Sequence, residues 1–223
     1  MQSRKYGRTY HLPFSQGVSN DDKILKDWQG LLKKELLITE KLDGENTCLK
    51  STGVFARSHA APTRNPWAKN MWVIWDRLRD SLGDLEVFGE NLYGIHSIEY
   101  QQLSYHFYVF AIREGDHWLS WEEVLFFADI LDLATVPVFE MGKFTEKELK
   151  ELITKRMELG SALGGDCEGF VLRNADGFSS VDFKYNVLKY VRKNHVQTDE
   201  HWTRNWKRAA LWYEKPMAQR FNP

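Results

Sequence analysis

The sequence predicts an α+β fold in which two antiparallel sheets are flanked by helices. Two observations support this prediction. Short apolar runs are joined by turn pairs such as Asp43-Gly44 and Asp176-Gly177, a pattern typical of antiparallel strands. Signatures of the form Ser/Thr-x-x-Glu precede segments whose apolar residues recur at helical spacing, as expected where a helix begins.

The apolar runs define the expected strands. The first three runs are close together in the sequence, and they predict an antiparallel meander. The expected strands span residues 36–42, 47–51, 54–57, 86–90, 105–113, 168–173, 178–184 and 187–192.

Periodicity and capping signals define the expected helices. Apolar residues recur at helical spacing behind Pro66, which predicts a helix over 66–82. Capping boxes that start at Ser120 and Thr145 begin two more helices, which end near residues 131 and 159. A short helix is expected at 23–34, and the last one at 198–213.

The 223 residues suit one large domain with short appendages. Residues 1–22 are polar and contain glycine and proline, so we expect an irregular N-terminal arm there. Residues 23–193 would form the domain, and 194–223 a helical tail packed on it. Because 43% of the residues are hydrophobic and 27% are charged, the domain can bury a core.

Neither the cysteines nor the apolar pattern indicates secretion or a membrane. Cys48 and Cys167 have no zinc spacing, so two buried thiols in a reducing compartment are expected. No apolar run follows the basic N-terminal residues, and no stretch of 18 apolar residues occurs. We therefore expect a soluble cytoplasmic protein, and we favour a monomer, although the sequence is silent on oligomeric state.

The net charge of −1 argues against a general attraction to polyanions. Basic residues nevertheless gather toward the C-terminus. Arg204, Lys207 and Arg208 fall in the expected tail helix, where they would form a local nucleic-acid surface. A solvated basic helix explains the same residues equally well.

A candidate nucleophile lies in the segment Lys41-Leu-Asp-Gly44. Lys41 ends an apolar run, and Gly44 lets the backbone turn tightly beside a ligand. An amine attacks only when it is neutral, and burial and nearby cations lower its pKa. Taken alone, this tetrapeptide is more typical of a surface lysine beside a hairpin turn.

Further chemical signals follow Lys41 in order. Taken singly, Glu90 and Glu168 are also typical of strand-end carboxylates that face solvent, and Phe110 of a core aromatic. These alternatives weaken together because all the candidates fit one site. The elements are Ala56-Arg57-Ser58, Phe88-Gly89-Glu90, Phe107-Tyr-Val-Phe110, Glu168-Gly-Phe-Val-Leu-Arg173 and Lys189-Tyr-Val-Arg192.

This ordered set resembles the nucleotidyltransferase motifs of the covalent ligase and capping-enzyme superfamily. It is most similar to those of ATP-dependent RNA ligases of the RNA ligase 2 type. The resemblance runs from about residue 36 to about residue 192. It implies the ATP-grasp-like nucleotidyltransferase fold of DNA and RNA ligases, with ATP bound between two sheets.

The resemblance implies a role for each matched residue. Lys41 would attack the α-phosphorus of ATP and hold AMP as a phosphoamide. Glu168 would bind Mg²⁺ or Mn²⁺, directly or through water, and Lys189 would grip the α-phosphate. The others would bind the nucleotide: Glu40 the adenine through its backbone, Asn46 a phosphate or the nucleic-acid end, Arg57 the ribose or a phosphate, Glu90 the ribose hydroxyls, and Phe110 the adenine ring.

The last motif departs from the family's pattern. The family has Lys-x-Lys, whereas Val191 stands two residues after Lys189 here. Lys184 and Arg192 are candidates for the missing contact, although both would face the other side of a continuous strand. Asp43 is a further candidate because it lies in the catalytic loop, and it is equally explained as the first residue of a turn.

Nearby cations also lead to an expectation about charge. Arg57 and Lys189 would disfavour the protonated form of Lys41 by like-charge repulsion. We therefore expect a neutral Lys41 amine beside a metal-bound triphosphate.

The implied activity is ATP-dependent ligation of RNA ends. Lys41 would take AMP from ATP, AMP would pass to a 5′-phosphate, and a 3′-hydroxyl would then displace it. The partners would be ATP, a divalent cation and RNA ends in a nicked duplex or a single strand. We expect no separate OB-fold module of ordinary size, and this expectation favours RNA over DNA. Alternatives are a DNA ligase, a GTP-dependent capping guanylyltransferase, and a nucleotide- or nucleic-acid-binding module that does not ligate.

Overall fold

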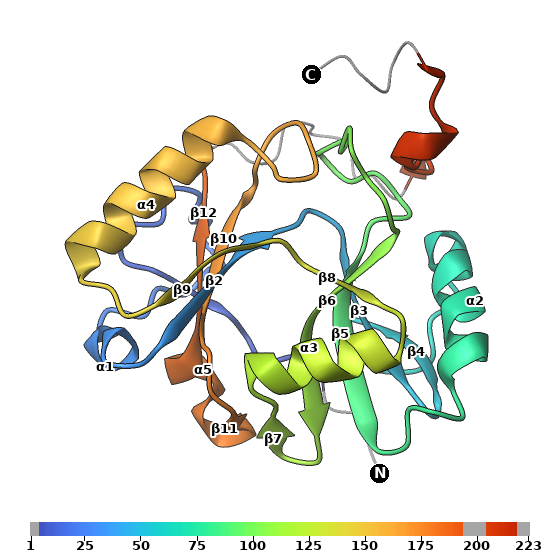
Figure 1. Ribbon diagram of the computed structural model, residues 1–223, viewed down its shortest axis with the longest axis horizontal. Coiled ribbons are helices and arrows are strands. Elements are labelled where there is room, and N and C mark those ends of the chain that lie inside the picture. Colours follow the sequence, from blue (N-terminus) through green and yellow to red (C-terminus); the bar gives the residue numbers. More distant parts are fainter. Residues whose placement is uncertain (1–4, 194–203, 218–223) are drawn as a thin grey trace.

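The computed structural model describes residues 5–193 and 204–217 (Figure 1). The strands form two sheets, and the three longest helices, α2, α3 and α4, lie on the outer sides of these sheets. The expected α+β fold with two largely antiparallel sheets is confirmed, although each sheet also contains one parallel strand pair.

The first sheet has the strand order β1-β12-β10-β2-β9. Its outer face packs against α4 through a cluster of buried aliphatic and aromatic side chains. Residues alternate between the two faces, so Lys41 and Lys189 lie on the inner face, toward the second sheet. The strands span Tyr10–His11 (β1), Leu36–Lys41 (β2), Val138–Gly142 (β9), Gly169–Asn174 (β10) and Val187–Val191 (β12).

The second sheet has the order β11-β7-β6-β5-β3-β4, and β8 pairs with β6 beside this path. Its outer face packs against α2 and α3 in the largest hydrophobic cluster. The strands span Glu45–Lys50 (β3), Gly53–Ala56 (β4), Leu85–Asn91 (β5), Phe107–Glu114 (β6), His117–Trp118 (β7), Ala134–Thr135 (β8) and Phe178–Ser179 (β11).

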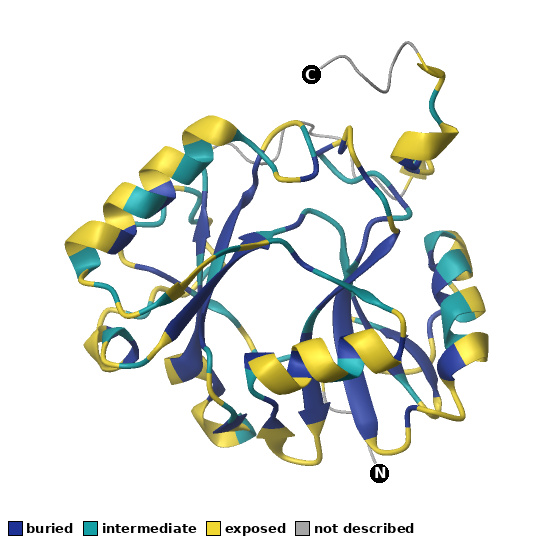
Figure 2. Cartoon of the chain, in the orientation of Figure 1, coloured by how far each residue is buried: buried dark blue, intermediate teal, exposed yellow. Residues whose placement is uncertain are grey.

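The helices cover the sheets, with their outward sides exposed (Figure 2). The capping boxes expected at Ser120 and Thr145 are both present, and they begin α3 and α4. The α-helices span Gln29–Leu32 (α1), Lys69–Leu78 (α2), Trp121–Ile130 (α3), Glu146–Leu159 (α4) and Phe183–Asn186 (α5), and 3-10 turns span Pro66–Ala68, Ser180–Asp182 and Trp212–Glu214.

The inner faces of the two sheets share an aromatic core. Phe88 and Trp118 from the second sheet pack with Phe183 of α5 and with Val187, the first residue of β12 in the first sheet. Tyr6 from the N-terminal segment inserts its ring among them, 5.1 Å from the ring of Trp118. Cys48 is buried in this core, and both cysteines are free and buried, as the sequence predicts.

The predicted meander is wrong at its first turn. β2 pairs with β10 and β9 in the first sheet, whereas β3 pairs with β4 and β5 in the second. The chain therefore crosses between sheets at residues 42–44. Both strands are largely buried, so a short-range turn signal does not say which partner each strand takes.

The strand expected over 178–184 is also wrong. Only Phe178 and Ser179 pair as a strand, and a 3-10 turn followed by α5 takes up the rest. Packing of Phe183 against the aromatic core between the sheets accounts for this change. The short strand β9, which the sequence analysis missed, closes the edge of the first sheet beside β2.

The expected tail helix is not present in the described part of the tail, which covers residues 204–217. This part is mostly irregular, with a 3-10 turn at Trp212–Glu214 and an isolated bridge between Arg208 and Gly94. Backbone hydrogen bonds instead attach it to the body, from Ile95 N to Lys207 O and from Ala209 N to Tyr93 O. The remainder of the expected helix, 198–203, lies outside the described residues.

The N-terminal arm is more ordered than expected, because it contributes β1, which pairs in parallel with β12. Among the helices of the described ranges, none is both long and apolar enough to cross a lipid bilayer.

Candidate active site

Lys41 is the last residue of β2, immediately before the chain crosses between sheets. Gly44 allows this crossing, since a Cβ at this position would lie 2.6 Å from Asn91 O and 2.7 Å from a methyl carbon of Leu92. Asp43 anchors the same crossing. Its Oδ2 accepts hydrogen bonds from the backbone N–H groups of Ser97 and Ile98 and from the Ser97 hydroxyl.

Glu168 is the direct partner of Lys41. The distance from Lys41 Nζ to Glu168 Oε2 is 2.7 Å, and the side chains are 27% and 6% exposed. Strand register brings them together, because Lys41 pairs with Gly169, the residue after Glu168. Arg192 N donates a hydrogen bond to Glu168 O and so fixes the backbone on the other side.

Glu90 approaches the same amine from the second sheet. It lies in β5 opposite Asn46, and its Oε1 accepts a hydrogen bond of 3.1 Å from Gly44 N. Burial raises the pKa of Glu90 to about 8; the charge of Lys41 opposes this shift, and Glu168 and Asp43 add to it. Burial likewise raises the pKa of Glu168, against the opposing charge of Lys41.

In the free protein Lys41 keeps its proton, so the neutral amine expected beside a metal-bound triphosphate stays a prediction for the ATP complex. Burial alone would lower the pKa of the ammonium group, but the negative charges of Glu168, Glu90 and Asp43 outweigh burial, and the pKa is raised. Carboxylates dominate this site more than cations do, so an unliganded Lys41 carries its proton.

Lys189 lies on the same face of the first sheet as Lys41. In the strand register, Lys189 is opposite Val171, which in turn is opposite Thr39. Lys189 forms an ion pair of 3.1 Å with Asp22 from the N-terminal segment. Burial lowers the pKa of Lys189, Asp22 opposes this shift, and Lys41 adds to it.

The four other residues predicted for the site differ in exposure and in their contacts. Glu40 points to the opposite face, where its Oε2 accepts a hydrogen bond from Ala162 N, so only its backbone faces the inner side. Asn46 is half-buried, and its side-chain oxygen has no hydrogen-bond partner within the described residues. Phe110 is half-buried and packs edge-on against Tyr6, whereas Arg57 is exposed in the turn after β4.

Neither candidate for the missing second lysine is directed at Lys41. Lys184 lies exposed in α5, with its ammonium group 4.6 Å from the ring centre of Tyr185. Arg192 forms an ion pair of 2.9 Å with Asp166. The chain does not continue as a strand from Lys184 to Lys189, because α5 intervenes, and Lys184 is exposed on this helix.

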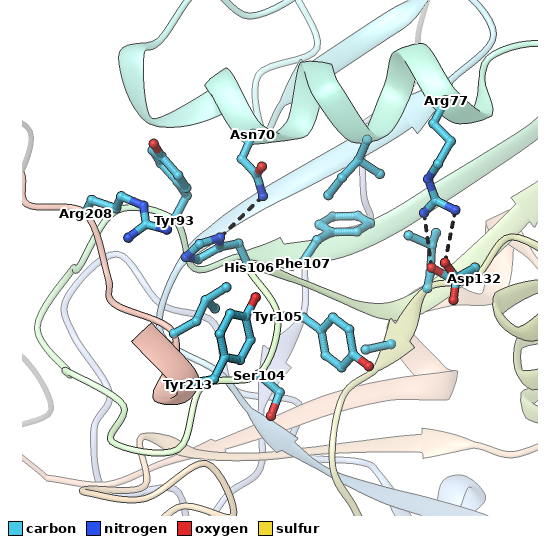
Figure 3. A pocket seen from close by; sticks show the side chains of 14 residues that line it. Asn70, Arg77, Tyr93, Ser104, Tyr105, His106, Phe107, Asp132, Arg208 and Tyr213 are labelled. Atoms are coloured by element: carbon cyan, nitrogen blue, oxygen red, sulfur yellow. Dashed lines mark hydrogen bonds and ion pairs between the residues drawn. The ribbon is translucent and has the colours of Figure 1, made fainter. Parts of the chain in front are cut away.

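The three basic tail residues do not share a helix, contrary to the prediction. All three are exposed, and Arg208 forms a bidentate ion pair with Glu214. Arg208 lines a pocket of about 430 Å³ between α2, the start of β6 and the tail (Figure 3). Two pairs of its polar side chains contact each other, Arg77 with Asp132 and Asn70 with His106, and Lys41 is not part of it.

Comparison with known proteins identifies the family. Residues 34–191 match the sequence profile described as RNA ligase, and this match covers more than half of the chain. The chain belongs to the RNA ligase family. Comparison with curated protein sequences found no matching relative.

Solved structures share the fold of this RNA ligase-family chain at low sequence identity. An archaeal ATP-dependent RNA ligase, form 2, has 19% identity over 85% of this chain and 48% of its own, with a TM-score of 0.56. An RNA ligase from Naegleria gruberi, an apo mutant, has 16% identity over 84% and 57%, with a TM-score of 0.54. A protein from Aquifex aeolicus that is described as a candidate ATP-dependent DNA ligase has 19% identity over 84% of this chain and 50% of its own, with a TM-score of 0.55. This chain therefore spans about half the length of these proteins.

The acidic groups of this family member suit a divalent cation that is shared with a phosphate. Within the described ranges, no group of three or more His, Cys, Asp or Glu residues is arranged to hold a metal ion. Glu168 and Glu90 nevertheless place two carboxylates beside Lys41. Mg²⁺ is commonly held by one or two carboxylates together with phosphate oxygens and water, and this donor set fits that arrangement.

Sequence reasoning missed three residues near the site of this RNA ligase-family chain. Asp22 and His11 come from the N-terminal segment, which carries no motif signal. Arg173 was noted only as the end of a motif. It is 4% exposed, and its guanidinium donates hydrogen bonds to Phe110 O and Leu119 O, which connects the two sheets.

Proposed function

We propose that this chain is an ATP-dependent RNA ligase that joins a 5′-phosphate to a 3′-hydroxyl through a lysyl-AMP intermediate on Lys41. One observation carries the proposal. In a chain of the RNA ligase family, Lys41 lies where two sheets meet, 2.7 Å from Glu168 and within the electrostatic reach of Glu90. A half-buried amine among carboxylates on a nucleotidyltransferase fold is suited to covalent nucleotide transfer.

In the first step, Lys41 Nζ would attack the α-phosphorus of ATP. A nitrogen–phosphorus bond forms, the bond from that phosphorus to the bridging oxygen breaks, and pyrophosphate leaves with the electron pair. Lys41 must first lose its proton. Glu168 is positioned to accept it, because its Oε2 lies 2.7 Å away and burial raises the pKa of this carboxyl.

The other residues would orient the nucleotide. Glu90 would accept hydrogen bonds from the ribose hydroxyls, and the half-buried ring of Phe110 would support the adenine. Lys189 would bind the α-phosphate and stabilise the charge that builds on its oxygens. AMP would then pass to the 5′-phosphate of RNA, and the 3′-hydroxyl would expel it as the new phosphodiester forms.

A divalent cation, when bound, would neutralise phosphate charge during these transfers. A variant of the Naegleria gruberi RNA ligase was solved with ATP and Mn, which supports the same requirement here. Glu168 is the residue that we propose as its ligand, with either Mg²⁺ or Mn²⁺. We further propose that the substrate is broken RNA and that the protein repairs it in the cytoplasm as a monomer.

The first step is tested by covalent labelling. The protein is incubated with α-³²P-labelled ATP and Mg²⁺, denatured and separated by electrophoresis. Wild-type protein should retain label, and Lys41→Ala should retain none, because no other side chain supplies the attacking amine. Lys147→Ala is the matched control, since this lysine is 85% exposed on α4. Label on the Lys41→Ala chain would remove the assignment, and labelling by GTP in place of ATP would indicate a capping-type enzyme.

The substrate is tested by ligation of matched nicks. Duplexes with a single nick are prepared with RNA, DNA or hybrid strands, and a single-stranded RNA is included. Sealing of RNA ends in preference to DNA ends is the expected result. Lysyl-AMP formation followed by sealing of DNA alone would retain the Lys41 chemistry and reject the RNA specificity.

A further inference from the structure

The family match begins at residue 34, yet the residues before it reach the site. β1 pairs with β12 so that His11 lies opposite Lys189, and Leu12 N donates a hydrogen bond to Lys189 O. Farther along, Gly17 N donates to Val191 O. A Cβ at Gly17 would lie 2.3 Å from Arg192 O, so the close approach needs glycine. The segment thus follows the strand that carries Lys189.

Asp22 is the point at which this segment meets Lys189. Its Oδ1 lies 3.1 Å from Lys189 Nζ and 3.1 Å from His11 Nε2. Its other oxygen, Oδ2, accepts hydrogen bonds from the backbone N–H and the hydroxyl of Ser19. The carboxylate is therefore held through one oxygen and presents the other to the lysine.

His11 is the buried neighbour of Asp22 in this arrangement. Its side chain has no exposed surface, and its Nδ1 lies 2.8 Å from Ser15 Oγ, which accepts a hydrogen bond from Val191 N. Burial lowers the pKa of His11, and the charge of Lys189 adds to this effect. In a neutral ring, Nδ1 can accept a hydrogen bond from the Ser15 hydroxyl, while Nε2 lies 3.1 Å from Asp22 Oδ1 without hydrogen-bond geometry.

The charges around Lys189 show what Asp22 contributes. Asp22 from the N-terminal segment, His11 from β1, Lys41 from β2 and Glu168 before β10 act on it. Burial and Lys41 both disfavour its ammonium form, whereas Asp22 favours it. The pKa of Asp22 is itself lowered, since the hydrogen bonds from Ser19 and the charge of Lys189 outweigh burial. Asp22 therefore carries its negative charge at neutral pH.

We propose that Asp22 is a positioning residue that holds Lys189 Nζ on the inner face of the first sheet, where the α-phosphate of ATP would bind. The N-terminal segment, outside the family match, thereby forms part of the nucleotide site. An ammonium group has three donors, so Lys189 can bind a phosphate oxygen while it keeps its contact with Asp22. This inference rests on the proposed function, in which Lys189 binds that phosphate.

Asp22→Asn tests the role, because it keeps the shape of the side chain and removes its charge. The rate of lysyl-AMP formation is measured against ATP concentration and against pH. We expect the rate to fall roughly tenfold to a hundredfold, as for loss of one charge-assisted contact. The descending alkaline limb of the pH profile should also move to lower pH, because Lys189 would lose its proton more easily.

Controls separate positioning from general damage to the fold. Asp21→Asn alters the neighbouring exposed carboxylate and should leave the rate unchanged. Asp22→Glu should recover part of the rate. In a Lys189→Ala background, Asp22→Asn should have little further effect, since its target is absent. Circular dichroism and thermal unfolding report whether each variant folds.

Two results would overturn the proposal. The first is a rate of lysyl-AMP formation and a pH profile of Asp22→Asn equal to those of the wild type. The second is a fall in that rate on adding Asp22→Asn to Lys189→Ala as large as in the wild-type background. If Asp22→Asn does not fold, Ser19→Ala replaces it, because this change removes a 2.8 Å hydrogen bond to Asp22. The alkaline limb of its pH profile should move to lower pH. An alkaline limb at the wild-type position would then overturn the proposal. Wild-type protein without label would overturn the proposed function as well, whereas wild-type label with an unshifted variant would overturn the positioning role alone.

Discussion

The two faces of the first sheet come from the same strands but differ in chemistry. On the outer face, Leu36, Ile38, Leu172 and Leu188 are each 1% exposed or less and pack under α4. On the inner face, the same strands carry the charged residues Lys41, Arg173 and Lys189. Alternation of side chains along a strand makes both faces available from one short sequence.

This difference separates stability from chemistry. The outer face removes apolar surface from water, which is the main favourable contribution to folding. The inner face buries charge, which is favourable only where each charge has a partner. Lys41 has Glu168, Lys189 has Asp22, and Arg173 has backbone carbonyls of the second sheet. Substitutions on the two faces should therefore have different consequences.

The largest expected effect lies on the inner side, at Glu168. Glu168→Gln removes the carboxylate beside Lys41 and the proposed cation ligand. We expect lysyl-AMP formation to slow by about 10²–10³-fold, the effect of losing one preorganised charge-stabilising group. The rate is measured with saturating ATP and Mg²⁺. Glu151→Gln, at a carboxylate that is 65% exposed on α4, is the control. A rate for Glu168→Gln within twofold of the wild type would contradict this role.

The next effect lies on the outer face, at Leu188. Leu188→Ala leaves a cavity under α4 and should lower the free energy of unfolding by about 3 kcal/mol. Urea denaturation measures this loss. Leu159→Ala, at a side chain that is 66% exposed, should change stability by less than about 0.5 kcal/mol. At temperatures where the variant is folded, lysyl-AMP formation by Leu188→Ala should continue. Loss of activity in the folded variant would show that the two faces are not separable.

A third effect is a change of stability with pH, and it tests the burial of charge at Glu90. Its pKa is raised from 4.5 to about 8 in the folded chain, so the folded state binds this proton more tightly than the unfolded state does. Its contribution to stability is complete below pH 4.5 and is lost as the pH rises toward 8. The loss is at most about 1.4 kcal/mol per pH unit.

Glu90→Gln should remove this contribution and flatten the decline of stability between pH 5 and pH 8. Urea unfolding of wild type and variant at each pH measures the difference. A residual slope is expected in both proteins, because burial also raises the pKa values of Glu40 and Glu168. Parallel curves for the two proteins would show that Glu90 titrates as an exposed carboxyl does.

Local signals in the sequence predicted the elements near the site well. The capping boxes at Ser120 and Thr145 set the starts of α3 and α4, because these signals act within four residues. The strand that carries Glu90 and the strand after Glu168 were also expected, since their apolar runs are continuous. Long-range pairing was not predictable in the same way. The partner of β2 depends on burial against β10 and β9, which lie about 100 residues or more farther along the chain.

The sequence by itself determined the types of chemical group and their order: a lysine followed by Asp-Gly, then Glu90, Glu168 and Lys189. Only the tertiary structure decided their distances and charges. Strand register sets the distance of 2.7 Å between Lys41 and Glu168, and the carboxylates around Lys41 reverse the pKa shift expected from cations. Asp22 reaches Lys189 across 167 positions of sequence. The physical reason is that electrostatic and packing energies depend on distance in space. Strand pairing brings close together residues that no local sequence pattern connects.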